Sequence, residues 1–156
     1  MPKHNETYSL NYSAEQMFSL VSDVNKYSEF LPWCNRSVVI KNMFDSKGNE
    51  ILIADLHLGY KFFQEKFRSE VHLSKKKTNI KITYISGPFE YLVNEWSFTN
   101  KGKSNCDILF NIDFEFKNKY FDTLMNAFFI QAFKKMVIAF EERALKIYGK
   151  PKRNLH

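Results

Sequence analysis

The sequence predicts an α+β domain in which a curved antiparallel sheet of about seven strands wraps around one long C-terminal helix. Alternating apolar and polar residues fill most of residues 37–116, and apolar residues at helical spacing fill residues 119–148. Short polar turns separate the alternating segments, which is typical of an antiparallel meander. The 156 residues suit one domain, expected over residues 1–149 and followed by a basic tail at 150–156.

A short strand and two helices are expected to come first, giving the order β-α-α-β6-α. The strand is predicted over residues 7–12. Ser13 and Gln16, three residues apart, form a capping box that begins the first helix. Its apolar spacing continues to about residue 24, and a second short helix is expected over about residues 25–30.

An apolar break follows the second helix, at residues 27–34, Tyr-Ser-Glu-Phe-Leu-Pro-Trp-Cys. Pro32 biases Leu31 away from helical conformation, so the helix is expected to end at Phe30. Connecting segments are usually polar and solvated. This one is therefore expected either to be buried as core or to line a site for an apolar ligand.

Six strands are predicted after this break. The first spans residues 37–44 and ends at the polar turn 45–49. The others have apolar residues at every second position, and we expect them over residues 52–60, 67–73, 80–84, 92–98 and 106–116. The last shows the clearest alternation, with Leu109 as an exception on the polar face. One apolar and one polar face indicate a sheet solvated on one side.

The long helix is expected over residues 119–148, with Gly149 and Pro151 ending it. A sheet with one apolar face must be covered, and this helix is the natural cover. In such a helix-grip arrangement a strongly curved sheet leaves space beside the helix. The chain has 16 phenylalanines to wall that space, although an aromatic helix stripe is equally typical of plain core.

If the space is a ligand cavity, its walls are expected to come from the apolar break, the inward strand positions, the turn at residues 87–89 and the long helix. The candidate cavity residues are Phe30, Leu31, Pro32, Trp33, Leu56, Leu58, Tyr60, Phe67, Tyr84, Pro88, Phe89, Trp96, Phe110, Phe128, Phe133 and Met136.

The formal net charge of +6 and the sequence pI near 9.2 permit contact with anionic membranes or RNA. Rings and cations interleave over residues 60–68, a pattern that suits either base stacking or an ordinary half-solvated strand. A basic patch is also possible near the C-terminus, from Lys134, Lys135, Lys146, Lys150, Lys152 and Arg153. No signal core or stretch of about 20 apolar residues is present, so we expect a cytoplasmic protein that can touch a membrane.

No catalytic or metal-binding motif is written in the sequence, so no catalytic residues and no metal ligands are predicted. Cys34 and Cys106 are expected to be buried reduced thiols, and apolar neighbours should raise the pKa of Cys34. Asp55 and His57 share a strand face and are expected to form a solvated surface pair.

Several motifs resemble a known family. Residues 12–18, Tyr-Ser-Ala-Glu-Gln-Met-Phe, and the apolar break resemble the start of the coenzyme Q-binding proteins, within the START-like polyketide cyclase and lipid-transport superfamily. The likeness continues through the Gly-Pro-Phe at residues 87–89, Leu92, residues 96–98 and residues 113–116. It covers almost the whole chain. Asn94-Glu95 departs from it, because other members often carry a glycine there.

This resemblance implies a helix-grip fold with a hydrophobic tunnel for a polyprenyl quinone. Ubiquinone is then the expected ligand of a non-catalytic protein that supports respiratory electron transfer and needs no cofactor. Its quinone head would accept hydrogen bonds from Tyr84, Asn94 or Trp96, and the protein would lie in the cytoplasm, peripheral to an anionic inner membrane. Bacterial members are also named ribosome-association toxins, which implies binding to the large ribosomal subunit, and older names imply a polyketide cyclase or dehydrase.

Overall fold

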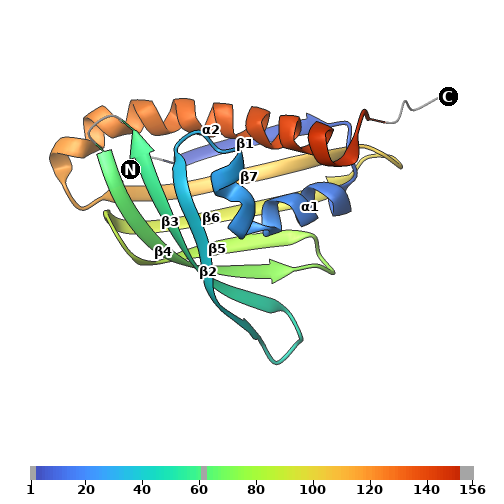
Figure 1. The fold of residues 1–156 in the computed structure, drawn as a ribbon, viewed down its shortest axis with the longest axis horizontal. Coiled ribbons are helices and arrows are strands. Elements are labelled where there is room, and N and C mark those ends of the chain that lie inside the picture. The colour runs from blue at the N-terminus through green and yellow to red at the C-terminus, as the bar shows by residue number, and fades with distance from the viewer. Residues whose placement is uncertain (1–2, 61–62, 152–156) are drawn as a thin grey trace.

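A computed structural model describes residues 3–60 and 63–151, and it confirms the predicted order of elements (Figure 1). The first three elements are β1 (Lys3–Leu10), α1 (Ala14–Ser22) and the 3-10 helix η1 (Val24–Glu29). Six strands and the long helix follow: β2 (Cys34–Phe44), β3 (Glu50–Tyr60), β4 (Phe63–Ser74), β5 (Asn79–Ser86), β6 (Phe89–Asn100), β7 (Cys106–Phe116) and α2 (Lys119–Tyr148).

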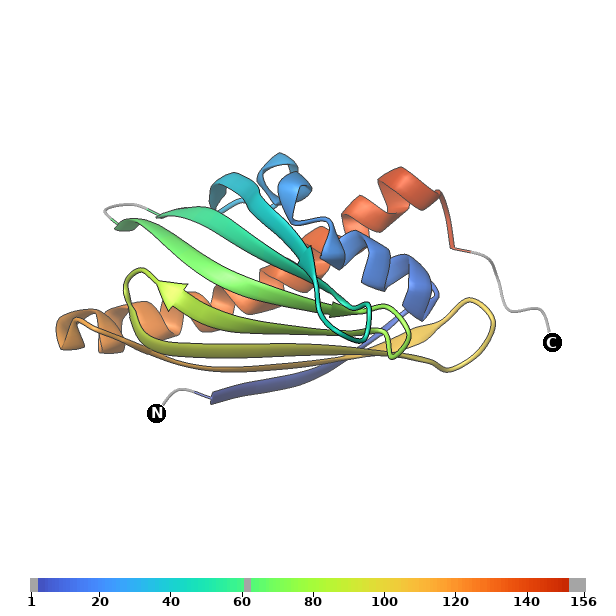
Figure 2. The same ribbon diagram turned by 90° about the horizontal axis from the view of Figure 1, so that it is seen from below.

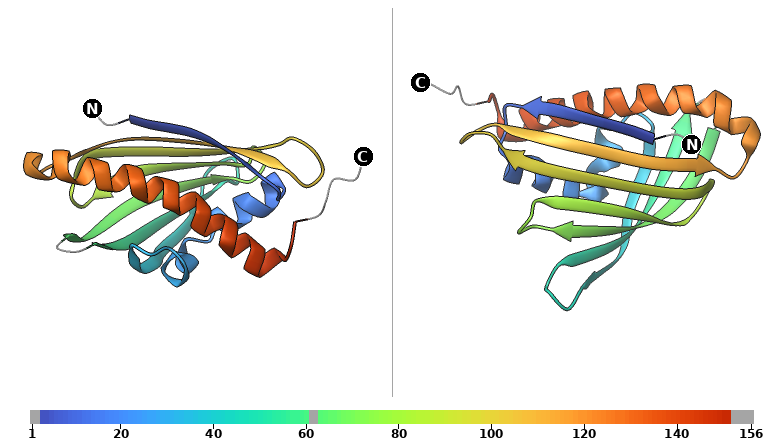
Figure 3. Two further views of the ribbon diagram at one scale, coloured as in Figure 1. Left: turned by 90° about the horizontal axis from the view of Figure 1, so that it is seen from above. Right: turned by 180° about the vertical axis from the view of Figure 1, so that it is seen from behind.

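The seven strands form one antiparallel sheet in the order β1-β7-β6-β5-β4-β3-β2. Strands β2 to β7 form a meander, and β1 pairs with β7 at the edge of the sheet. The sheet curves around α2, which crosses its inner face (Figures 2 and 3). Register shifts mark bulges in β2, β5 and β6, which increase local twist and bending.

The capping box of the first helix is confirmed. The Ser13 hydroxyl accepts from the Gln16 amide at 3.1 Å, and the Gln16 side chain accepts from the Ser13 amide at 2.9 Å. The far end of α2 is tied to this region, because the Tyr148 hydroxyl donates to the Gln16 carbonyl and the Tyr12 hydroxyl donates to the Gly149 carbonyl. These two bonds, 3.0 and 2.9 Å long, set the position of α2 across the sheet.

Several predicted boundaries were wrong, including the starts of β4 and β6, which lie at Phe63 and Phe89 rather than at residues 67 and 92. The first strand was expected at residues 7–12 but spans Lys3–Leu10, because it pairs with β7 along that whole length. Helix α1 ends at Ser22 rather than near residue 24, since the chain continues as η1. Strand β2 begins at Cys34 rather than residue 37, because Cys34 already pairs with Leu58 of β3.

The core lies between the sheet and α2. Its largest fully buried side chains are mostly phenylalanines from β6, β7 and α2, namely Phe89, Phe110, Phe114, Phe116 and Phe140. Leu109 is 43 % exposed on the outer face, as its break in the alternation predicts. Cys34 and Cys106 are both buried free thiols, as expected. Within the described residues, no helix has the length and apolar character needed to cross a membrane.

The outer face of β3 and β4 carries an ion pair that differs from the predicted one. Asp55 does not pair with His57 as a solvated couple; it is 8 % exposed and accepts two hydrogen bonds from Arg68, at 2.8 and 3.0 Å. Arg68 lies directly opposite Asp55 in the register of the two strands. These bonds hold the pKa of the Asp55 carboxyl below its usual value. The cross-strand pair therefore stabilises the sheet on the side away from α2.

Candidate ligand cavity

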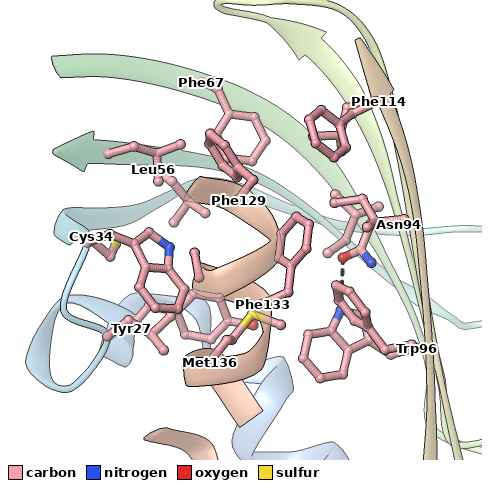
Figure 4. A pocket seen from close by; sticks show the side chains of 18 of the residues that line it. Tyr27, Cys34, Leu56, Phe67, Asn94, Trp96, Phe114, Phe129, Phe133 and Met136 are labelled. Atoms are coloured by element: carbon pink, nitrogen blue, oxygen red, sulfur yellow. Dashed lines mark hydrogen bonds between the residues drawn. The ribbon is translucent and has the colours of Figure 1, made fainter. Parts of the chain in front are cut away.

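An apolar cavity of about 110 Å³ lies between the inner face of the sheet and α2 (Figure 4). Inward side chains of β3 to β7 form one wall, and one face of α2 forms the opposite wall. Helix η1 and the segment that links it to β2 close a third side. The lining residues are Tyr27, Leu31, Trp33, Cys34, Leu56, Leu58, Phe67, Ile82, Phe89, Leu92, Asn94, Trp96, Phe110, Ile112, Phe114, Phe129, Ala132, Phe133, Met136 and Phe140.

Phe89 is the centre of the aromatic wall. It is 1 % exposed, stacks on Phe116 at 4.9 Å between ring centroids, and meets Phe67 edge to face at 5.7 Å. Gly87 makes this packing possible, because its φ is +143° and an added Cβ would lie 2.7 Å from the Cβ of Phe67. The Gly-Pro-Phe sequence thus turns the chain tightly and buries Phe89 against the strand that carries Phe67.

One polar pair interrupts the apolar wall. Asn94 and Trp96 are 6 % and 3 % exposed, and the Trp96 indole N–H donates to the Asn94 side-chain oxygen at 2.9 Å. The Asn94 amide nitrogen donates to the Asn111 carbonyl at 2.8 Å. These two bonds fix which side of the amide carries oxygen and which carries nitrogen. The same amide nitrogen carries a second N–H, and no acceptor for it is found among the described residues.

The titratable groups that line the cavity are held in their neutral forms. Burial raises the pKa of Tyr27, whose hydroxyl donates to the Val21 carbonyl. Burial also raises the pKa of the Cys34 thiol to about 11, as its apolar neighbours predict. The described lining contains no Asp, Glu, His, Lys or Arg. Among the residues that the structure places, no group of three His, Cys, Asp or Glu side chains is arranged to hold a metal ion.

A groove of about 470 Å³ adjoins the cavity and leads to the surface. It is lined by Pro32, Trp33, Gly59, Ala127, Phe128, Gln131, Ala132 and Lys135. Trp33 and Ala132 line both spaces, so these two side chains separate the cavity from the groove. The Trp33 carbonyl accepts from the Gly59 amide at 2.9 Å, which fixes the apolar break against β3. We call this groove the mouth.

The structure brings most of the candidate cavity residues together around this space. Leu31, Trp33, Leu56, Leu58, Phe67, Phe89, Trp96, Phe110, Phe133 and Met136 line the cavity. Pro32 and Phe128 line the mouth instead. The Tyr60 side chain is not among the side chains that the structure describes.

Three candidates, Phe30, Tyr84 and Pro88, line neither space. Phe30 packs against Phe140 at 5.1 Å and carries the Arg143 guanidinium over its ring. The Tyr84 hydroxyl accepts from the Phe89 amide at 3.1 Å, so this group fixes the backbone of a wall residue. The Pro88 carbonyl accepts from the Lys117 amide at 2.9 Å and fixes the turn. Each therefore positions a wall residue or a neighbouring element without facing the cavity.

Sequence reasoning also missed several wall residues. Phe129 lines the cavity where Phe128 was predicted, because the two phenylalanines are neighbours on the helix and only packing decides which one faces inward. Tyr27 and Cys34 belong to the apolar break but were not selected. The signal that could have found Ile82, Leu92, Ile112 and Phe114 was present, since all four occupy inward strand positions.

A curved antiparallel sheet that holds a long C-terminal helix over an apolar cavity defines a START-like helix-grip protein. The chain belongs to the family described as polyketide cyclase / dehydrase and lipid transport, whose model matches residues 10–141. It is 33% identical over 144 residues to the ribosome association toxin RatA of Rickettsia prowazekii, covering 90% of this chain and 94% of that protein. It is 32% identical over 151 residues to the mitochondrial coenzyme Q-binding protein COQ10 homolog B of Xenopus laevis, covering 95% of this chain and 60% of that protein.

Solved structures agree with this assignment. An 18 kDa protein from Caulobacter crescentus superposes with a TM-score of 0.80 at 31% identity, over 96% of this chain and 100% of that one. The ZhuI aromatase/cyclase from Streptomyces also gives a TM-score of 0.80, over 92% of this chain and 93% of that one. Its identity is 13%, so this second likeness shows the fold alone.

Proposed function

We propose that this protein binds a polyprenyl quinone of the ubiquinone class and carries it without catalysing a reaction on it. The observation that carries this proposal is an apolar cavity whose wall carries one buried polar pair, Asn94 and Trp96. Such a cavity suits a ligand that is mostly hydrocarbon and has a few oxygen atoms on one ring. The similarity to a protein named for coenzyme Q binding supports the same ligand class.

The cavity volume supports a particular arrangement of the ligand. At about 110 Å³ the cavity is somewhat smaller than an engineered apolar cavity of ~150 Å³ that binds benzene. This space has no room for a polyprenyl chain. We therefore place the quinone ring in the cavity, with an oxygen near Asn94, and the tail in the mouth beyond Trp33 and Ala132.

Tail burial then contributes much of the affinity. Each methylene that leaves water contributes about 0.8 kcal/mol, so a few isoprenoid units in the mouth outweigh one hydrogen bond. Phe128 and Pro32, both predicted as cavity residues, line this route. The ring hydrogen bond to Asn94 would select among lipids, because a plain hydrocarbon end would leave that donor unpaired.

A carrier role is favoured over a cyclase role by the chemistry of the wall. Acid–base catalysis needs a group whose pKa lies near the working pH. The titratable side chains in the described lining are Tyr27 and Cys34, and burial raises the pKa of both. The likeness to an aromatase/cyclase extends to the fold alone, and it adds no catalytic group to this cavity.

The test is the identity of the lipid that copurifies with the protein. We expect mass spectrometry of protein purified from quinone-producing cells to find bound quinone at close to one molecule per chain. Filling the cavity by Ala132→Leu should remove that lipid while the protein still folds. A cavity that stays empty after purification from membrane-bearing cells would overturn the proposal.

The second candidate function is binding to the large ribosomal subunit. Two observations favour it: the relative named ribosome association toxin, and the exposed lysines at residues 75–77 in a chain with a net charge of +6. Contacts to RNA phosphates weaken steeply as salt rises. Co-sedimentation with isolated large subunits at moderate salt would support this function. Failure to co-sediment, or loss of co-sedimentation only when cavity residues are changed, would contradict it.

A further inference from the structure

The exposed face of α2 beside the mouth combines isoleucines with lysines. One side of the helix carries six residues whose consecutive spacings alternate between three and one, at positions 127, 130, 131, 134, 135 and 138. Ile130 is 41 % exposed and Ile138 is 57 % exposed, and the lysines at 134 and 135 are exposed between them. Gln131 and Lys135 also line the mouth. We call these six residues, Ala127, Ile130, Gln131, Lys134, Lys135 and Ile138, the mouth face.

The mouth face is locally cationic. Between Asp122 and Glu141, α2 contains two lysines and no carboxylate. Within the part of the chain that the structure describes, no ion pair to Lys134 or Lys135 is recorded. Across the mouth, the described lining from the other elements is uncharged. Two unpaired lysines flanked by exposed isoleucines suit a partner that is anionic at its surface and apolar just beneath.

A lipid bilayer has that layered chemistry, and we propose that the mouth face docks on an anionic lipid surface. Docking in this way points the mouth at the bilayer, so the ligand passes between membrane and cavity without crossing water. The lysines would lie at the level of the lipid phosphates, while Ile130 and Ile138 would enter the boundary with the acyl chains. The inference rests on the proposed function for its purpose, but the docking itself can be measured without any quinone.

The direct experiment is sedimentation with vesicles, comparing an equimolar mixture of phosphatidylcholine and phosphatidylglycerol with phosphatidylcholine alone. Each lysine near such a surface changes partition by about fivefold, so Lys134→Gln with Lys135→Gln should lower it about thirtyfold. The matched control is Lys75→Gln with Lys76→Gln, which removes the same charge from the exposed turn between β4 and β5. We expect the control to change partition less than about twofold.

Equal losses in the two lysine pairs would overturn the proposal, because they would indicate a general charge effect. Equal partition of the unchanged protein onto neutral and anionic vesicles would also overturn it. The proposal would also be overturned if the Lys134→Gln, Lys135→Gln variant lost co-sedimentation with large ribosomal subunits but kept its binding to vesicles. In that case the mouth face would be a ribosome contact.

A second measurement separates this inference from the proposed function. Quinone loading is titrated in solution without vesicles, using a short-tailed ubiquinone as the probe. The lysine variant should load normally and lose only transfer to and from anionic vesicles, because its cavity is intact. Normal loading with no vesicle binding in the unchanged protein would overturn the docking surface alone. Vesicle binding with no loading would overturn the proposed function and leave the docking surface standing.

Discussion

The substitution Ala132→Leu separates ligand binding from folding. Ala132 is 4 % exposed and lines both the cavity and the mouth, so a larger side chain there enters the space that the ligand needs. Leucine adds three carbon atoms and is a good helix former. If these exclude three ligand carbons, each worth about 0.8 kcal/mol, binding weakens by about 2.4 kcal/mol, or roughly sixtyfold.

The same change should have a small effect on stability. Filling apolar space gains about 2.4 kcal/mol, and overpacking costs about 1–3 kcal/mol, so the net change lies between a gain of about 1.4 kcal/mol and a loss of about 0.6 kcal/mol. For a chain of this size that is a shift of at most about 3–6 °C in Tm. The assays are quinone titration and thermal unfolding of the same preparation. The matched control is Ala139→Leu, which lies on the same helix outside the cavity lining and should keep the quinone Kd within about twofold.

Two results would refute this reasoning. If Ala132→Leu stabilises the protein and leaves quinone affinity unchanged, the space beside Ala132 is a packing defect in the core and not a ligand site. If affinity and Tm fall together and Ala139→Leu does the same, the loss reports general damage to α2.

Three further substitutions test the geometry of the fold and the wall. Asn94→Leu leaves the Trp96 indole N–H without its acceptor and an opposing carbonyl without its donor, so urea unfolding should show a loss of about 2–6 kcal/mol. Gly87→Ala places a Cβ at 2.7 Å from that of Phe67 with φ at +143°, so the free energy of unfolding should fall by about 2–4 kcal/mol. Asp55→Asn removes a carboxylate whose pKa is lowered by ion pairing, and it should cost about 1–2 kcal/mol at pH 7. A carboxyl whose pKa is lowered by folding stabilises the folded state at pH values above its unfolded pKa, which is near 3.9. The unchanged protein should therefore lose this contribution as pH falls below about 4. In that range its free energy of unfolding should approach that of Asp55→Asn.

Each of these predictions has a result that would contradict it. A loss below about 1 kcal/mol for Asn94→Leu would show that the polar pair is not buried as described. For Gly87→Ala the comparison is Gly48→Ala, where φ is also positive but an added Cβ meets nothing within 4 Å. Equal losses at the two glycines would mean that backbone conformation, not the contact with Phe67, sets the cost. Parallel pH profiles for the unchanged protein and Asp55→Asn would exclude the ion pair as the acid-sensitive contact.

Local patterns predicted the elements and the faces of the sheet. Period-two alternation placed Phe67, Trp96 and Phe110 on the inner face, and the capping box placed the start of α1. These features depend on neighbours in the sequence, so the sequence carries them directly. The N-terminal strand was different, because residues from Lys3 onward are mostly polar and become a strand by pairing with β7, about a hundred residues away.

Long-range packing decided which of the candidate residues face the cavity. Phe128 and Phe129 fit the helical stripe equally well, and the rotation of α2 on the sheet selects Phe129 for the cavity. Tyr84 has the inward alternation, but the recorded pairing of β5 with β6 runs from Asn79 to Thr83. Its hydroxyl then reaches the Phe89 amide and not the cavity. Neither the helix rotation nor the end of a pairing is written in a local pattern.

The central claim is that a quinone ring enters the cavity while its tail lies in the mouth, and tryptophan fluorescence tests it directly. The chain has two tryptophans, so Trp33→Phe leaves Trp96, in the cavity wall, as the only one. Because a quinone quenches tryptophan emission at contact, ubiquinone should quench Trp96 strongly, with saturation at one ligand per chain. An isoprenoid alcohol with the same tail should compete without quenching. Unchanged Trp96 emission, while quinone is bound, would contradict the account, because the ring would then lie outside the cavity.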